Sequence, residues 1–214
     1  MNMKFKNQKL VALLALTACL GGALSACAPV IIGGAVMGSF VATDRRTSGT
    51  QLEDEGIELR TANRIRDNLG DRGHINVTSY NRQVLITGEV QSPQDKQLVE
   101  QVASKVENVR AIVNDTAILA ETTFSQRSAD ALASGRVKAG FVDARDLFSN
   151  AFKVVTERGT TYLMGRVTQR EADRATDIAR STSGVHKVVR VLEIISEEEL
   201  ANTLPRPAAT ESKK

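Results

Sequence analysis

Few side chains in this 214-residue chain have the types and spacing that catalysis or metal binding requires. The chain contains two cysteines, Cys19 and Cys27, and two histidines, His74 and His186. Metal-ligand spacings such as His-x-x-x-His or Cys-x-x-Cys are absent from the sequence, as are nucleophile motifs and glycine-rich phosphate loops. Each histidine begins a predicted strand, where a lone histidine is more often a surface residue than a ligand. We therefore expect no catalytic residue, no metal site and no enzyme activity.

Cys27 is the residue whose surroundings indicate a specific chemical modification. The sequence Leu24-Ser25-Ala26-Cys27 resembles the lipobox of bacterial lipoproteins, in which the cysteine carries diacylglycerol. Leu16-Thr17-Ala18-Cys19 is a second, weaker match, because it leaves too short an apolar region before the cysteine. Cleavage before Cys27 removes Cys19, so no thiol remains for a disulfide. The expected prosthetic group is a covalent N-terminal lipid on Cys27, with no other cofactor.

The residues before Cys27 have the pattern of a lipoprotein signal peptide, predicted over 1–26. Lys4, Lys6 and Lys9 precede an uncharged apolar run, and no acidic residue occurs in this segment. The run has about fifteen residues, fewer than the roughly 20 that span a bilayer as a helix. Directly after Cys27 stand Ala28 and Pro29 instead of an aspartate. In lipoproteins this pattern implies the outer membrane, with the protein facing the periplasm.

Residues 27–52 are predicted to form a lipidated N-terminus and a flexible linker. The uncharged stretch 28–43 is rich in glycine, alanine and valine. Two interpretations remain open for this stretch: a tether, which its glycines favour, or a segment that lies near the lipid head groups.

The charge of the whole chain, +3, does not describe its working part. The predicted leader contains three of the 28 basic residues and none of the acidic ones, so the mature chain is neutral. Nucleic-acid binding loses its compositional support. Residues 53–120 hold 8 basic and 11 acidic groups, whereas residues 121–195 hold 12 basic and 9 acidic groups. The second segment is therefore the better candidate for an anionic partner.

Two parts of the chain repeat one pattern of short strands. Residues 75–90 and 152–167 each contain two apolar, β-branched runs around a polar turn, and Gly88 matches Gly165 at a spacing of 77 residues. We expect each of these glycines at a strand end where a side chain would collide with the following helix.

Helices and a third strand complete each repeat. Ser92 and Thr168 stand at predicted N-caps with an acidic residue three positions later. The predicted order is helix, strand, strand, helix, strand, twice. The fold class is therefore α+β: two tandem small modules, 53–120 and 121–195, each with helices on one face of a three-stranded mixed sheet. Residues 196–214 are predicted to be a disordered tail.

The repeats, with the element Gly184-Val185-His186-Lys187-Val188, resemble the BON domain. Together with the lipobox and the linker around Asp44-Arg45-Arg46, the chain resembles the dual-BON outer-membrane lipoproteins of the DolP type. Asn108 stands in the first copy where Gly184 stands in the second, so the first helix-to-strand turn lacks its glycine.

The leading helix of the second module, predicted over 128–141, is the candidate binding element. Its residues Ala129, Ala133, Val137 and Phe141 form one apolar stripe, which packs most simply on the sheet. The resemblance implies that this helix binds anionic phospholipid such as phosphatidylglycerol or cardiolipin. The candidate phospholipid-binding residues are Leu132, Arg136, Val137, Lys138 and Phe141. An ordinary amphipathic helix with a solvated basic flank is the alternative interpretation.

Three alternative functions are open for the mature chain. The first is a non-enzymatic lipid-anchored protein that recognises anionic phospholipid and maintains outer-membrane integrity; the resemblance also implies division sites. The second is a protein-binding adaptor that supports outer-membrane protein assembly machinery. The third, a glycan-binding module, is disfavoured because six Phe, two Tyr and no Trp leave few aromatic rings for stacking on sugars. Neither the packing of the modules nor the oligomeric state follows from the sequence.

Overall fold

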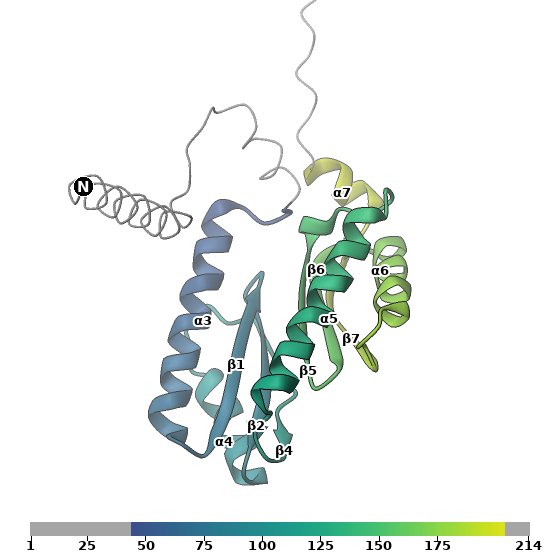
Figure 1. The fold of residues 1–214 in the computed structure, drawn as a ribbon. Coiled ribbons are helices and arrows are strands. Elements are labelled where there is room, and N and C mark those ends of the chain that lie inside the picture. The colour runs from purple at the N-terminus through teal and green to yellow at the C-terminus, as the bar shows by residue number, and fades with distance from the viewer. Residues whose placement is uncertain (1–43, 204–214) are drawn as a thin grey trace, which may run out of the picture. The chain divides into compact units, whose positions relative to one another are not determined.

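The computed structural model describes residues 44–203, which form two α+β modules in tandem. In order along the chain, the elements of the first module are α3 (Ser48–Leu69), β1 (Gly73–Tyr80), β2 (Gln83–Val90), α4 (Pro93–Ala103), β3 (Ala111–Asn114) and β4 (Ala117–Ile118) (Figure 1). Strand β2 pairs antiparallel with β1 and parallel with both β3 and β4. The predicted third strand is therefore present as two short pieces.

The second module repeats this order with a longer, uninterrupted third strand. Its elements are α5 (Phe124–Asp143), a short 3-10 helix (Ser149–Ala151), β5 (Phe152–Glu157), β6 (Thr160–Thr168), α6 (Gln169–Ser181), β7 (Lys187–Ile195) and α7 (Glu197–Thr203). Strand β6 pairs antiparallel with β5 and parallel with β7. The predicted α+β class, with two helix-strand-strand-helix-strand modules, is confirmed.

Both predicted N-caps form. The Ser92 hydroxyl accepts the backbone N–H of Asp95 at 3.1 Å, and Pro93 occupies the first helical turn of α4. Thr168 and Glu171 make a reciprocal capping box at the start of α6. These local signals set where α4 and α6 begin.

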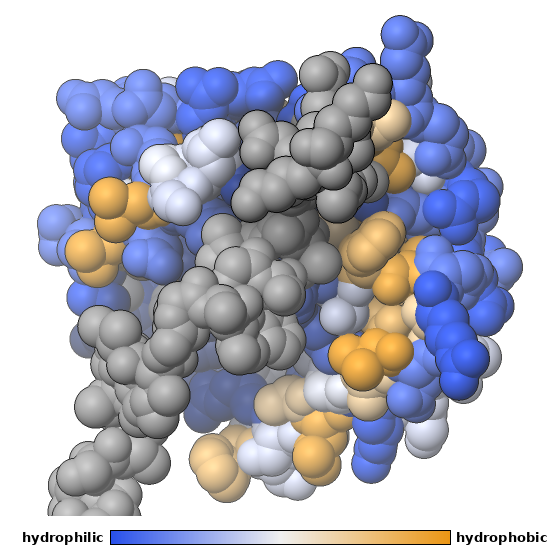
Figure 2. Space-filling model, turned by 90° about the horizontal axis from the view of Figure 1, so that it is seen from above, coloured by the Kyte–Doolittle hydropathy of each residue, from blue (hydrophilic) through white to orange (hydrophobic). Residues whose placement is uncertain are grey.

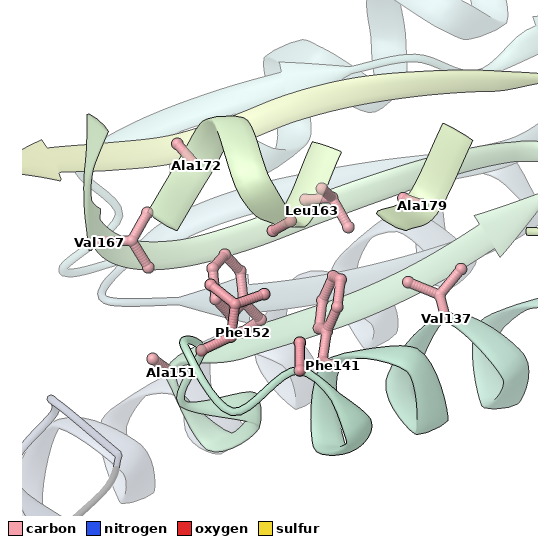
Figure 3. Packing of buried hydrophobic residues seen from close by; sticks show 11 residues of the cluster. Val137, Phe141, Ala151, Phe152, Leu163, Val167, Ala172 and Ala179 are labelled. Atoms are coloured by element: carbon pink, nitrogen blue, oxygen red, sulfur yellow. The ribbon is translucent and has the colours of Figure 1, made fainter. Parts of the chain in front are cut away.

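Each module has its own apolar core between its helices and one face of its sheet. In the first, Ile57, Ile65 and Leu69 of α3 pack with Val84 and Ile86 of β2. In the second, Phe141 of α5 meets Phe152 of β5, with ring centroids 5.0 Å apart (Figure 3). Because side chains alternate along a strand, the opposite face of each sheet carries a second apolar set.

Those opposite faces meet between the two modules. Tyr80 and Leu85 of the first sheet pack with Tyr162, Met164 and Val191 of the second in a buried cluster. The Tyr162 hydroxyl donates to the carboxylate of Asp115 at 2.7 Å across the same junction. Burial of these residues joins the two modules through their sheets, a relationship that the sequence left open.

Gly88, near the end of β2, and Gly165, near the end of β6, exclude a side chain for a different reason from the one expected. A Cβ on Gly88 would stand 2.0 Å from the carbonyl oxygen of His74, and Gly88 has φ +109°. A Cβ on Gly165 would stand 2.6 Å from the carbonyl oxygen of Ala151. Both clashes involve backbone that lies beside the glycine across the sheet: β1 for Gly88, and the residue before β5 for Gly165. The expected collision with the following helix is therefore wrong.

Two predicted boundaries need correction. Helix α3 begins at Ser48, so the last five residues of the predicted flexible linker, 48–52, are helical. The predicted disordered tail is wrong for residues 197–203, which form helix α7 (Glu197–Thr203). Burial of the Leu200 side chain holds this helix on the module. Asn108 replaces the missing glycine by adopting φ +64° itself, which asparagine tolerates better than most residues. The signal peptide, Cys27 and Cys19, the stretch 28–43 and residues 204–214 lie outside the described residues.

No helix within residues 44–203 has both the length and the apolar content needed to cross a membrane.

Candidate functional site

Helix α5 is longer than the predicted span 128–141 and begins at Phe124. The Thr123 hydroxyl accepts the backbone N–H of Gln126, and the Gln126 side chain in turn accepts the Thr123 N–H at 2.8 Å. Thr123 and Gln126 have the spacing of a capping box in the sequence, a local signal that places the helix start four residues before the predicted one. As a result Phe124, whose side chain is 80% exposed, lies on the first turn of the helix.

The five predicted lipid-contact residues separate into three groups in the structure. Leu132 is 60% exposed, and Arg136, four residues later on the same face, is also exposed. Val137 and Phe141 are fully buried in the core of the second module. Their assignment as lipid-contact residues is wrong, because their side chains hold the helix on the sheet and cannot reach a ligand at the surface.

Lys138 lies on the opposite flank of α5 from Arg136. It is half-buried and shares a hollow with Asp44, Arg46 and Tyr80. Burial lowers the pKa of the Lys138 ammonium, partly offset by Asp44. Lys138 therefore faces the first module and the linker, and it does not add to the charge around Arg136.

A cleft runs beside the exposed face of α5, with a volume of about 480 Å³. Ala129, Leu132 and Arg136 form its helical wall. The opposite wall is formed by Arg158, Gly159, Gly184 and His186. The volume falls within the roughly 300–1,000 Å³ typical of small-molecule sites. Ala129, which was expected on the core-facing stripe, is exposed and lines this cleft instead.

The charged side chains that line the cleft differ in how many hydrogen-bond partners they have. Both oxygens of Asp130 accept backbone N–H groups, from Arg158 and Gly159, at 2.8 Å each. Arg158 donates to Glu89 of the first module at 3.0 Å, and Glu89 is fully buried. Among residues 44–203, Arg136 makes one hydrogen bond, a long one of 3.4 Å to the carbonyl oxygen of Ser183. Arg136 is therefore the cation on this wall with the most donor groups left for an anion.

Exposed apolar side chains accompany the cleft at the beginning of α5. Ile118, Leu119 and Phe124 are 47%, 53% and 80% exposed. Ile118 ends β4, Leu119 follows it in the connection between the modules, and Phe124 begins α5. On the face seen in Figure 2, apolar residues form separate patches within a mostly hydrophilic surface. Clusters of exposed apolar side chains mark interaction sites more often than single exposed ones do.

The two histidines lie in different surroundings. His186 lines the cleft, and its ring packs against Gly159, where a Cβ would come within 2.4 Å of its Nδ1. The Nδ1 atom of His74 lies 3.6 Å from the Glu89 carboxylate. Among residues 44–203, no group of three or more His, Cys, Asp or Glu side chains has an arrangement that could hold a metal ion. The predicted absence of a metal and of catalysis stays a prediction.

Both modules match a known protein family. The BON domain model matches residues 53–120 and 129–196, so the chain is a protein of two tandem BON domains. It is 36% identical over 191 residues to the outer membrane lipoprotein DolP of Haemophilus influenzae, covering 88% of this chain and 96% of that one. The chain therefore belongs to the dual-BON outer-membrane lipoproteins of the DolP type.

Two further likenesses are more distant. A 21 kDa hemolysin of Actinobacillus pleuropneumoniae is 29% identical over 154 residues, covering 71% of this chain and 79% of that one. A solved structure of CdsD, a structural protein of the type III secretion system of Chlamydia trachomatis, has 12% identity and a TM-score of 0.29, covering 66% of this chain and 95% of that one. A likeness as low as this carries no argument about function.

Proposed function

We propose that this chain is a non-enzymatic, lipid-anchored protein of the outer membrane that faces the periplasm and binds anionic phospholipid through its second BON domain. It thereby maintains outer-membrane integrity, with division sites as its place of action. Phosphatidylglycerol and cardiolipin are the proposed ligands, and Cys27 is the proposed site of lipid attachment. The observation that carries the proposal is the exposed pair Leu132 and Arg136 on one face of α5.

The pair combines the two forces that hold a protein at an anionic membrane surface. An exposed leucine gains free energy when it enters the boundary between head groups and acyl chains. A cation near an anionic leaflet contributes about 1 kcal/mol, and salt screens it. Phe124, about two helical turns before Leu132, extends the apolar part of the surface. These contributions are small, so the proposed association is shallow and depends on the lipid anchor to keep the domain near the membrane.

Vesicle co-sedimentation tests the proposal. The chain from residue 27 with Cys27→Ser, which carries no lipid, is mixed with vesicles of phosphatidylethanolamine alone or with phosphatidylglycerol added, at low and high salt. We expect binding to the anionic vesicles that falls as salt rises, and an approximately tenfold loss for Arg136→Glu. Arg174→Glu is the matched control, because Arg174 is half exposed in the same module and pairs only with Asp146 among the described residues. Equal binding to both kinds of vesicle, or wild-type binding by Arg136→Glu, contradicts the proposal.

A protein-binding adaptor is the second candidate, supported by one observation on the first module. Leu52 and Leu59 are 70% and 65% exposed and lie two turns apart on one face of α3. Such a stripe suits the groove of a protein partner in the outer-membrane assembly machinery. Pull-down from detergent-solubilised envelopes with wild type and Leu59→Ser separates the candidates. A stoichiometric partner that Leu59→Ser loses supports the adaptor, whereas its absence contradicts the adaptor.

A further inference from the structure

Glu89 of the first module is a fully buried carboxylate with a hydrogen-bond partner for one of its two oxygens. Its Oε1 accepts from Nη1 of Arg158, in the turn between β5 and β6 of the second module, at 3.0 Å. Its Oε2 has no partner among the described residues, and neither has the buried Nδ1 atom of His74. Because buried polar atoms are rarely left unpaired in folded proteins, these two atoms indicate a contact that a change of state completes.

The two unpaired atoms lie close to each other. His74 on β1 is the antiparallel partner of Glu89 on β2, so their side chains stand on the same face of the sheet. The distance from Nδ1 to Oε2 is 3.6 Å, about 0.7 Å longer than an ordinary N–H···O hydrogen bond. The His74 side chain is 30% exposed, so its ring has room to shift and exchanges protons with solvent. A small movement of this ring therefore completes the contact.

Charged side chains from β2, from α5 and from the β5–β6 hairpin lie around His74. They are the carboxylates of Glu89, Asp130 and Glu157 and the guanidinium groups of Arg127 and Arg158. Three carboxylates against two guanidinium groups leave one negative charge in excess. Burial raises the pKa of Glu157, and a hydrogen bond from Asn76 offsets part of this effect. Glu89 and Asp130 raise the same pKa further. A positive charge on His74 therefore brings the cluster to neutrality.

From this geometry we infer that His74, Glu89 and Arg158 form a proton-sensitive latch between the two modules. When His74 is protonated, its Nδ1–H donates to Oε2 of Glu89 while Oε1 holds Arg158. A neutral ring can also carry its hydrogen on Nδ1, but a hydrogen bond between charged groups is about twice as strong. Histidine ordinarily changes its charge between pH 5 and pH 8. The latch is therefore complete in acid and weakened above neutral pH.

The latch reaches the cleft beside α5. Arg158 lines that cleft, and its Nη1 also donates to the carbonyl oxygen of Ala120, in the connection between the modules, at 3.3 Å. The backbone N–H of Arg158 is held by Asp130 at 2.8 Å. A proton taken up by a histidine of the first module therefore fixes one wall of a cleft in the second. This inference concerns the junction itself and stands whether or not the cleft binds lipid.

The first test is an NMR titration of the chain from residue 27, carrying Cys27→Ser, between pH 5 and pH 8. The chain has two histidines, and His186→Gln assigns their ring signals. We expect the Nε–H signal of Arg158 to shift with the same midpoint as the His74 ring. In Glu89→Gln most of this shift should be lost, because a neutral amide carries no charge from one side chain to the other. An Arg158 signal that does not follow His74 in the wild type overturns the inference.

The second test compares urea denaturation of wild type and His74→Gln at pH 5.5 and pH 7.5. A charged histidine that gains an anionic partner on folding makes the folded chain bind more protons than the unfolded chain. Its stabilisation is therefore present in acid and is lost as the pH rises. We expect His74→Gln to raise the equilibrium constant for unfolding about threefold to tenfold more at pH 5.5 than at pH 7.5. An equal effect at both pH values overturns the inference.

Two variants control for other sources of pH dependence. His186 is the second histidine of the chain and has no ion pair with a carboxylate among residues 44–203, so His186→Gln should have the same effect at both pH values. Glu157→Gln removes the neighbouring carboxyl, and the pH-dependent effect of His74→Gln should persist in this background. Loss of that effect assigns the pH dependence to Glu157 and overturns the inference. If Glu89→Gln does not fold, the His74→Gln comparison decides.

Discussion

Arg45 and Glu171 form a buried, bidentate ion pair between residues 126 positions apart in the chain. The guanidinium Nη2 lies 2.7 Å from Oε1 of Glu171, and Nη1 lies 2.8 Å from Oε2. Only 3% of the Arg45 side chain and none of the Glu171 side chain is exposed. Arg45 precedes the first BON domain, whereas Glu171 caps α6 of the second. The chain that enters the first module is therefore fastened to the second one.

Removal of Arg45 should destabilise the fold strongly at neutral pH. Arg45→Gln leaves the Glu171 carboxylate buried without its cation, and such losses cost about 3–5 kcal/mol. We expect a lower midpoint in urea denaturation with a similar slope. Arg46→Gln is a comparison, because Arg46 pairs with Asp44 and Asp54 within the first module and its linker. A change below about 0.5 kcal/mol for Arg45→Gln would show that the ion pair contributes little.

The same ion pair should make stability depend on acid pH. Burial opposes ionisation of Glu171, but Arg45 and the Thr168 N–H outweigh it and lower its pKa. The folded protein therefore binds fewer protons at this site than the unfolded chain. This contribution is complete above the ordinary glutamate pKa, about 4.3, and is lost as the pH falls through the lower folded pKa. In Arg45→Gln the carboxylate protonates more readily, so the stability gap to wild type should narrow between pH 7 and pH 4.

Both tyrosines of the chain should resist ionisation until the protein unfolds. Burial raises the pKa of Tyr80 to about 12, and burial together with Asp115 raises the pKa of Tyr162 further. The chain has no other tyrosine, so tyrosinate absorbance reports on these two alone. Stability from both groups is complete below the unfolded value near 10 and falls as the pH rises toward the folded values. We expect absorbance at high pH to rise together with the loss of circular dichroism, and an earlier rise would contradict the buried junction.

Two glycine-to-alanine changes should have opposite effects on stability. Gly88→Ala places a Cβ 2.0 Å from the His74 carbonyl oxygen at φ +109°, so we expect a loss of more than about 2 kcal/mol. Gly135→Ala lies within α5, and no described atom beyond the adjacent residues and the helix's own backbone lies within 4 Å of the new Cβ. Alanine is the better helix former by about 1 kcal/mol, so this change should stabilise. Thermal denaturation of the two variants measures the difference, and equal midpoints would contradict the glycine assignment.

Arg136 and Lys138 should differ in their effect on phospholipid binding. Both are cations on α5, yet Arg136 borders the cleft while Lys138 faces Asp44 and Tyr80 on the other flank. Arg136→Glu should reduce binding to phosphatidylglycerol vesicles, and Lys138→Glu should leave it near the wild-type level. Comparable losses in both variants would indicate a diffuse basic surface in place of the Arg136 face.

Local signals in the sequence were sufficient for the elements of each module. Ser92 with Asp95 and Thr168 with Glu171 predicted two helix starts, because a cap is satisfied by neighbours three residues away. The repeat of Gly88 at Gly165 predicted the second module from the first. Periodicity alone could not assign Ala129, since a helical stripe is wider than the strip of contact that a sheet provides.

Tertiary structure decided everything that depends on residues far apart in the sequence. The sequence grouped Leu132, Arg136 and Lys138 on one helix, where Lys138 lies about 200° around the axis from Arg136. The tertiary structure covered that flank with the linker and the first module. It also hid Val137 and Phe141 and paired Arg45 with Glu171. Which face of a helix stays in water is set by what covers the other faces, and in this protein that cover comes from both modules.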